Sequence, residues 1–321
     1  MSIVTSRVAV GERKLPLTIQ FDEGSDIETF AAWHADNKEL VAEALLSIGA
    51  IHFRGIHSDT VEKFDRLSKY LSPEQKSFLD GNSPRGKYTS NVYNASEYDA
   101  NSIIRLHTEY SYSNIWPAYL FFCCITPAKT GGQTTVGDCR VMIDKLNPDL
   151  VEEFERKGIT YIRNLHAGNG LGPSWMDAFE TRDKAFLEDY CARNSIELYW
   201  QKDGSVRLVQ TRPAIRVHEQ TGDRLWFNQV DQFYPGIYGE EVYETLLMMA
   251  GNDEEALPMF SRYGDGTPIQ KEYVEEIVRV LDEVLIPVPW EKGDLLIVDN
   301  MIALHGRLPF TGDRKILVSM A

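Results

Sequence analysis

The chain has 321 residues, 43% of them hydrophobic and 25% charged, which is enough for one large domain with a sizeable core. Its 33 basic and 48 acidic residues give a formal net charge of −15, which argues against nucleic acid or an anionic membrane surface as a general partner. No signal peptide, membrane-spanning apolar run or disulfide-framework spacing of the four cysteines is recognisable, so a cytoplasmic location is expected.

The N-terminal part combines short strands with amphipathic helices. β-Branched and apolar runs predict strands at residues 8–10, 15–19 and 50–55. Helical spacing of apolar residues predicts helices at 26–49 and about 60–71. Asp59 and Glu62 have the spacing of a capping box, so the Asp59 carboxylate is expected to accept hydrogen bonds from backbone amides.

A long polar segment at residues 81–102 precedes a β-rich region. A connection of this length is usually functional, so an active-site loop or lid is expected, with a mobile surface loop as the alternative. Short apolar runs between Gly and Pro turns at 103–140 favour a barrel or jelly roll. Cys123 and Cys124 are expected to alternate on one of these strands as small apolar residues.

The remaining elements alternate between helices and hairpins. Helices are predicted at residues 141–156, 174–179, 182–193, 240–250 and 270–285. Hairpins are predicted for 196–200 with 206–210 and for 213–218 with 224–228. The apolar run 295–300 is expected to be a central buried strand, in which Asp299 and Asn300 fix the turn before His305.

A histidine and a carboxylate two residues apart, His107 and Glu109, lie in strand-like sequence. Side chains at this spacing on extended backbone point to the same face, so the pair could bind one metal ion together. His305 would complete a set of two imidazoles and one carboxylate, which suits Fe(II) and leaves positions open for substrate and dioxygen.

Two other His-x-Asp matches have simpler interpretations. His34 and Asp36 lie in a predicted helix, where residues two apart are about 200° apart around the axis and cannot chelate one ion. His57 and Asp59 precede the second helix, where the carboxylate is expected to serve as a cap.

Three motifs occur in order: HTE at 107–109, GGQTT-x-x-D-x-R at 131–140, and DN-x(4)-HGR-x-PF-x-G-x-R at 299–314. Together they resemble the taurine-dioxygenase (TauD/TfdA) family of Fe(II)/2-oxoglutarate oxygenases, from about residue 51 to the end of the chain. Within the family, the SyrP-like amino-acid hydroxylases of nonribosomal peptide pathways look most similar.

The resemblance implies a fold and a ligand set. The fold would be a β-rich α+β domain spanning 1–321, with a double-stranded β-helix (jelly-roll) core, flanking helices and insertions, and with about 81–102 and 164–195 as candidate active-site loops or lids. His107, Glu109 and His305 match the family's metal positions. Thr134 matches a threonine that assists 2-oxoglutarate binding, and Arg314 matches the arginine that pairs with its distal carboxylate. Because nine residues separate His305 from Arg314, a shorter spacing than in taurine enzymes, Arg307 is the alternative.

The chemistry implied is hydroxylation of an unactivated C–H bond with Fe(II), 2-oxoglutarate and O2, releasing succinate and CO2. Desaturation or cyclisation on the same centre stays open. The expected substrate is a small polar molecule, an amino acid or derivative in secondary metabolism. It is expected to be free rather than tethered to a peptidyl carrier protein, because carriers are usually acidic like this chain. Candidate substrate contacts are Arg85, Tyr93, His166 and Asn228, although Asn228 could instead cap a hairpin.

Two rival interpretations remain. The chain could be a non-catalytic jelly-roll binding protein, against which the complete ligand set argues. It could also be a metal-dependent oxygenase that does not use 2-oxoglutarate, and such an enzyme would not need Arg314.

Overall fold

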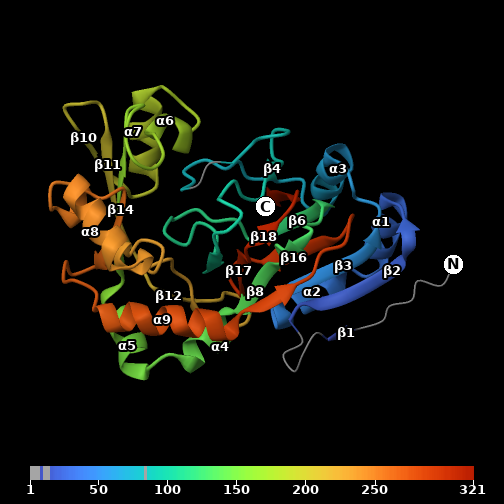
Figure 1. Ribbon diagram of the computed structural model, residues 1–321. Coiled ribbons are helices and arrows are strands. Elements are labelled where there is room, and N and C mark those ends of the chain that lie inside the picture. The colour runs from blue at the N-terminus through green and yellow to red at the C-terminus, as the bar shows by residue number, and fades with distance from the viewer. Residues whose placement is uncertain (1–7, 10–14, 83–84) are drawn as a thin grey trace.

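The computed structural model describes residues 8–9, 15–82 and 85–321, and its centre is a seven-stranded sheet (Figure 1). In sheet order the strands are β1 (Val8–Ala9), β2 (Leu17–Ser25), β3 (Ala50–Ile56), β16 (Leu295–Asp299), β6 (Tyr119–Thr126), β19 (Lys315–Met320) and β4 (Tyr93–Asn94). Neighbours are antiparallel except β2 and β3, which are parallel. Val10, predicted to continue the first strand, lies outside the described residues.

The central strands of this sheet are buried on both faces. Successive side chains of a strand point to opposite faces, and in β6 Leu120 and Phe122 join one core while Phe121 and Cys123 join another. Cys123 and Cys124 are both buried and free, as expected of small apolar strand residues. The sheet therefore separates two hydrophobic clusters, which explains why its central strands read as continuous apolar runs.

A second, four-stranded antiparallel sheet shares the first cluster with the large sheet. Its order is β15 (Ile286–Val288), β8 (Thr134–Asp138), β17 (Ala303–Arg307) and β5 (Ile104–His107). Leu106, Val136 and Leu304 from this sheet lie in the same cluster as Phe122 of β6. The core is thus β-rich, with strands from both halves of the chain side by side.

A third antiparallel sheet forms a separate lobe, on the left of Figure 1. Its strands are β10 (Glu197–Trp200), β11 (Val206–Arg212), β9 (Ile159–Leu165) and β14 (Met259–Tyr263). The helices α6 (Trp175–Ala178) and α7 (Lys184–Arg193) pack on it through a third cluster that includes Phe179 and Leu187. The predicted hairpin of 196–200 with 206–210 is confirmed by the β10–β11 pairing. Two further strand pairs are β12 (Ile215–Val217) with β13 (Arg224–Trp226) and β7 (Thr130–Gly131) with β18 (Phe310–Thr311).

The outer helices follow the apolar spacing of the sequence, with two breaks that it did not predict. The region 26–49 contains α1 (Ile27–Asp36) and α2 (Lys38–Ile48), separated at Asn37, whose side chain donates to the Trp33 carbonyl. The region 141–156 contains α4 (Cys139–Lys145) and α5 (Pro148–Lys157). Pro148 lacks an amide hydrogen and suits the first turn of a new helix, with Asn147 as its N-cap.

The start of α3 (Val61–Leu71) differs from the prediction. Thr60, rather than Asp59, is the N-cap, and its hydroxyl accepts from the Lys63 amide. The Asp59 carboxylate instead forms ion pairs with Lys63 at 2.8 Å and Lys292 at 3.1 Å. Each Asp59 carboxylate oxygen is therefore paired with a lysine ammonium group instead of accepting a hydrogen bond from a backbone amide at the start of the helix.

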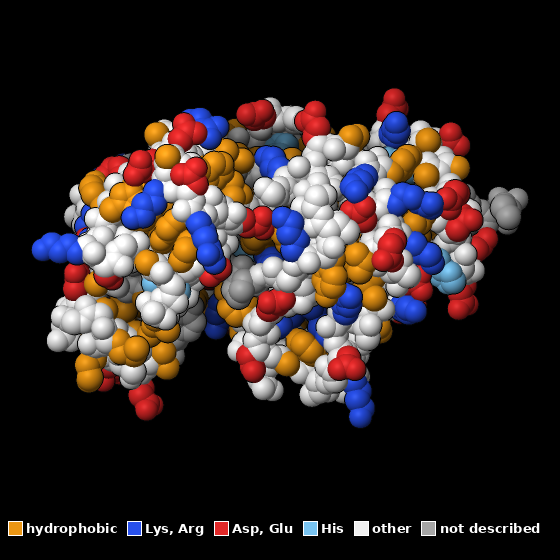
Figure 2. Space-filling model, turned by 90° about the horizontal axis from the view of Figure 1, so that it is seen from above, with side chains coloured by type: hydrophobic (Ala, Val, Ile, Leu, Met, Phe, Trp, Pro, Cys, Tyr) orange, Lys and Arg blue, Asp and Glu red, His pale blue; other side chains and the backbone are white. Residues whose placement is uncertain are grey.

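Two later helices complete the fold. In α9 (Lys271–Val284), Val274, Ile277, Leu281 and Val284 form the buried stripe expected of an amphipathic helix. The helix α8 (Glu240–Met249) follows a short 3-10 turn, η1 (Pro235–Tyr238), and a second such turn, η2 (Glu254–Ala256), precedes β14. None of the described helices is long and apolar enough to cross a membrane. Acidic and basic side chains are interspersed over the face shown in Figure 2.

Candidate active site

Two histidines that are far apart in the sequence are direct neighbours in the four-stranded sheet. His107, the last residue of β5, is the register partner of His305 on β17, and their ring centroids are 4.3 Å apart. The next residue, Gly306, permits this close pairing, because an added Cβ would lie 2.5 Å from the Ile104 carbonyl oxygen. The ladder therefore sets the two imidazoles side by side, and a β-bulge follows His305.

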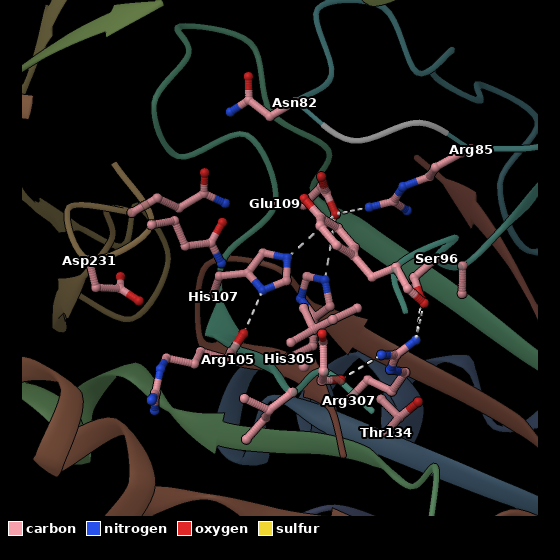
Figure 3. Close-up of a pocket in the computed structure, with 18 of the residues that line it drawn as sticks. Asn82, Arg85, Ser96, Arg105, His107, Glu109, Thr134, Asp231, His305 and Arg307 are labelled. Atoms are coloured by element: carbon pink, nitrogen blue, oxygen red, sulfur yellow. Dashed lines mark hydrogen bonds and ion pairs between the residues drawn. The ribbon is translucent and has the colours of Figure 1, made fainter. Parts of the chain in front are cut away.

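Glu109 completes the set from a turn rather than from the strand. The sequence predicted His107 and Glu109 on one extended segment, but β5 ends at His107 and Tyr110 has a φ of 60°. The turn brings a Glu109 carboxylate oxygen within 3.5 Å of His305 Nε2 and 4.0 Å of His107 Nε2. One ligand atom from each residue lies within 4.8 Å of the others, and all three side chains are about nine-tenths or more buried (Figure 3).

Asn300, just after β16, fixes the backbone of Glu109. Its amide nitrogen donates to the Glu109 carbonyl at 2.9 Å, and its amide oxygen accepts from the Glu109 amide at 2.7 Å. The same nitrogen donates to the Pro117 carbonyl at 2.9 Å. Asp299 caps the turn before His305 as predicted, by accepting from Met301 and Ile302. The sequence indicated a structural role for Asn300 in that turn, but it did not indicate that Asn300 clamps Glu109.

The protonation states of His107 and Glu109 suit a divalent metal ion. Burial, with the neighbouring His305, lowers the pKa of His107 to about 4. His107 Nδ1 donates to the Arg105 carbonyl at 2.9 Å, which leaves the Nε2 lone pair facing Glu109. Burial by itself would raise the pKa of Glu109, but Arg85 and the two imidazoles outweigh it and hold that pKa well below its usual range. A neutral imidazole and an ionised carboxylate are the forms in which these side chains bind metals.

A cavity of about 420 Å³ opens over the three side chains. Its wall includes apolar side chains from several elements, among them Phe122, Tyr112, Ile237 and Met259. Polar side chains include Asn82, Gln229 and Asp231, none of which the sequence indicated. The volume lies in the range of small-molecule sites, so the cavity can hold a co-substrate and a small substrate together.

The three residues implied in co-substrate binding all line this cavity. Thr134 on β8 is the register partner of Arg307 on β17, and its hydroxyl accepts from Trp290 Nε1 at 3.0 Å. The two arginines differ in how their donors are used. Both terminal nitrogens of Arg307 donate to protein oxygens in the segment 96–102, at 2.6–3.2 Å.

Arg314, by contrast, presents a guanidinium whose end is available to a ligand. Its Nε donates to the Gly132 carbonyl at 2.8 Å, and within the described residues its terminal nitrogens make no hydrogen bond or ion pair. Burial, together with Arg307, lowers the pKa of Arg314 to about 10, so it stays charged at neutral pH. Donor use thus favours Arg314 over Arg307 as the carboxylate partner.

Among the four candidate substrate contacts, the structure brings only Arg85 to the cavity. Arg85 lies 3.0 Å from the Glu109 carboxylate and its guanidinium is 3.8 Å from the centroid of the Phe78 ring. The Tyr93 hydroxyl is buried and accepts from the Phe78 amide. The His166 ring binds Gly168 and Gly172 within its own loop.

Asn228 binds the backbone next to the β12–β13 hairpin, in line with the capping role that was the alternative to substrate contact. Its side chain donates to the Ala214 carbonyl and accepts from the Val230 amide, so it holds the segment after β13. Tyr93, His166 and Asn228 therefore do not line the cavity, because each side chain is engaged with nearby backbone.

Of the two segments expected to be active-site loops, only one lines the cavity among the described residues. Residues 81–102 contribute Asn82, Arg85, Ala95, Ser96, Tyr98 and Ser102 to the cavity wall. The start of this segment is anchored to β9, where the buried Arg163 pairs with Asp80 and donates to Asn82. The described residues of 164–195 contribute none of the wall. A lid function for either segment stays a prediction.

Comparisons with known proteins agree with this geometry. A family model described as "Taurine catabolism dioxygenase TauD, TfdA family" matches residues 12–320. The chain is 34% identical over 280 residues to the dapdiamide synthesis protein DdaC of Enterobacter agglomerans, covering 87% of this chain and 84% of that protein. It is 28% identical over 291 residues to a clavaminate synthase-like protein of Arabidopsis thaliana, covering 88% and 84%.

A solved structure described as AAD-2 in complex with Mn(II) and N-oxalylglycine has a similar fold. The TM-score is 0.56 at 12% identity, over 100% of this chain and 97% of that chain.

Proposed function

The chain belongs to the TauD/TfdA family of Fe(II)/2-oxoglutarate-dependent oxygenases, and from this premise we propose that it hydroxylates an unactivated C–H bond of an amino acid or amino-acid derivative in secondary metabolism. The observation that carries the proposal is the buried set of His107, Glu109 and His305 at the floor of a cavity. The similarity to a dapdiamide synthesis protein supports a biosynthetic substrate. A small molecule fits a cavity of about 420 Å³.

The described residues fit Fe(II) and 2-oxoglutarate. His107, Glu109 and His305 would hold the metal, with the His107 imidazole neutral and the Glu109 carboxylate ionised. When bound, the metal with 2-oxoglutarate and O2 supplies an oxidant that removes hydrogen from a C–H bond, and succinate and CO2 are released. Arg314 would pair with the distal carboxylate of 2-oxoglutarate, and the Thr134 hydroxyl would orient it.

The remaining side chains around the set position substrate and limit water. Phe122 and Tyr112 line the wall with apolar surface, which strengthens charge interactions in the cavity. Arg85 pairs with the same Glu109 carboxylate oxygen that lies nearest the two histidines, and we propose that it also contacts substrate. The presence of Glu109 in the ligand set favours hydroxylation, while desaturation or cyclisation would use the same residues.

We further propose that the two central sheets form one double-stranded β-helix within a single domain spanning 1–321. Their shared hydrophobic cluster supports this arrangement. Residues 81–102 are proposed as an active-site loop, supported by their place in the cavity wall. The four buried, free cysteines support a reducing compartment such as the cytoplasm.

The test is succinate release from 2-oxoglutarate with Fe(II) and ascorbate, over a panel of free amino acids and related amines. We expect one compound to raise succinate well above the rate without substrate, and Glu109→Ala to abolish the increase. If no compound does so while 2-oxoglutarate still binds anaerobically to the Fe(II) protein, the free-substrate proposal fails and a carrier-tethered aminoacyl substrate takes its place. Absence of 2-oxoglutarate binding would contradict the co-substrate assignment and favour a binding protein or another oxygenase class.

A further inference from the structure

The charged side chains of the cavity are divided between two sides. Arg85, Ser96 and Arg307 lie on one side of the histidine pair, and Asp231 lies on the other with Arg105 (Figure 3). Arg314, which we assign to 2-oxoglutarate, also lines the cavity. Asp231 is not among the residues that we assign to the metal or to 2-oxoglutarate, so its carboxylate is available to the substrate.

Asp231 is buried but not satisfied. The residue is only 3% exposed, and its carboxylate oxygen Oδ2 has no hydrogen-bond partner among the described residues. Figure 3 shows the carboxylate pointing from its loop toward His107. Most buried polar atoms in folded proteins have partners, and an exception in a cavity wall indicates a partner that the folded chain does not itself supply.

The loop that carries Asp231 is held firmly. Gln229 donates from its side chain to the Thr108 carbonyl at 2.7 Å, and its amide donates to the Tyr161 hydroxyl at 3.2 Å. The Asn228 side chain donates to the Ala214 carbonyl and accepts from the Val230 amide. The carboxylate is thus positioned before any ligand arrives, which lowers the ordering cost of binding.

The charge of Arg105 acts on Asp231 without forming an ion pair with it. Arg105 forms an ion pair with Asp282 at 2.8 Å near the surface, and no ion pair between Arg105 and Asp231 is formed. Burial raises the pKa of Asp231 to about 7, and although the backbone amides of Asp231 and Gln232 and the charge of Arg105 oppose this rise, they do not cancel it. A cationic ligand would favour the ionised form and supply the missing donor.

We propose that Asp231 binds a protonated amine of the substrate, so that the enzyme selects molecules with a free ammonium group over their N-acylated forms. This inference rests on the proposed oxygenase function and refines its substrate class. The ammonium group would lie at the Asp231 side of the cavity, and the C–H bond to be oxidised would lie between it and the metal ligands. A charge-assisted hydrogen bond in a buried site gives strong discrimination, because the acylated analogue would leave the carboxylate without a partner.

The experiment uses the full-length protein loaded with Mn(II) and 2-oxoglutarate, in which binding is measured without turnover. Thermal-shift and calorimetric titrations are run with amino acids, diamino acids and simple amines, each paired with its N-acetyl derivative. The variants are Asp231→Asn, which keeps the shape and removes the charge, and Asp231→Glu, which keeps the charge. The matched control is Asp144→Asn, the same change at an exposed carboxylate on α4.

We expect at least one amine to bind wild type more tightly than its N-acetyl partner, and this preference to fall at least tenfold in Asp231→Asn, persist in part in Asp231→Glu and be unchanged in Asp144→Asn. Binding of 2-oxoglutarate should be the same in all four proteins. At pH 8 Asp231→Asn should melt no lower than wild type, whereas a purely structural Asp231 would make the variant less stable.

Two results would overturn the inference: no amine preference in wild type across the panel, or an equal preference in Asp231→Asn. Either result leaves the oxygenase function standing if wild type still binds 2-oxoglutarate and forms succinate with some compound. Loss of 2-oxoglutarate binding by wild type itself would instead contradict the proposed function.

Discussion

Replacing Asn300 with alanine should separate metal affinity from general stability. Asn300 is fully buried and makes three side-chain hydrogen bonds, two to the backbone of Glu109 and one to the Pro117 carbonyl. It contacts no solvent and does not line the cavity. Any effect of the substitution on metal binding must therefore act through the position of Glu109.

The expected cost follows from the three backbone groups that the substitution leaves without a partner. A buried polar group without its partner costs about 1–3 kcal/mol, so Asn300→Ala should lower the free energy of unfolding by about 3–5 kcal/mol after partial relaxation. Displacement of a metal ligand by loss of its support typically costs about 10–100-fold in metal affinity. Asn300→Asp should behave similarly, because a carboxylate would face the Glu109 and Pro117 carbonyl oxygens without a donor.

The assay is urea denaturation of the metal-free protein together with anaerobic Mn(II) titration of the folded protein. The matched control is Asn194→Ala, since Asn194 is also a buried amide, which donates to the Tyr190 carbonyl at the end of α7 away from the cavity. The control should lose stability and keep its Mn(II) affinity. If Asn300→Ala binds Mn(II) as tightly as Asn194→Ala does, the clamp does not position Glu109 and the reasoning is refuted.

Three further outcomes are expected. Arg314→Ala should raise the KM for 2-oxoglutarate about 100-fold, from loss of about 3 kcal/mol of paired charge, with Mn(II) affinity unchanged; an unchanged KM would move the assignment to another residue. Asp80→Asn should lower the free energy of unfolding by about 3–5 kcal/mol in urea, because it leaves Arg163 buried without its ion-pair partner, and a loss below about 1 kcal/mol would contradict this. The raised pKa of Asp231, about 7 against an ordinary 3.8, means that the native state keeps a proton that the unfolded chain releases, so the contribution of Asp231 to stability should fall as pH rises from about 4 to 7. Asp231→Asn should remove about 2–3 kcal/mol of that fall between pH 5 and pH 8, which urea denaturation at these two pH values would measure, and an identical pH dependence in the variant would disprove the shift.

Local pattern predicted most of the elements, because the period of the apolar residues reflects local geometry. The continuous apolar run at 119–124 became β6, buried on both faces, and the stripe at 270–285 became α9. The pattern was less informative at boundaries. The breaks at Asn37 and Pro148 divide two predicted helices, and neither residue changes the apolar spacing of the helix that it interrupts.

The sequence also indicated the chemical types at the site, and the structure brings His107, Glu109 and His305 together. The functional residues that it did not indicate depend on partners from distant segments. Asp231 stands out only because no donor among the residues that the structure describes reaches its Oδ2. Asn300 matters because its amide lies beside Glu109, and neither relation has a signature in the local sequence.

By itself, then, the sequence determined which side chains are available and which segments are strands, because both depend on residue type and short-range spacing. Only the tertiary structure decided register and donor use. Pairing β5 with β17 made His107 and His305 neighbours, and a turn rather than the strand positioned Glu109. Donor use likewise differs between the two arginines for a tertiary reason, because the terminal nitrogens of Arg307 donate to the segment 96–102, whereas among the described residues only the Nε of Arg314 donates. Strand register and the use of donors are set when distant segments pack together. A donor that already makes one hydrogen bond within the protein is no longer available to a ligand.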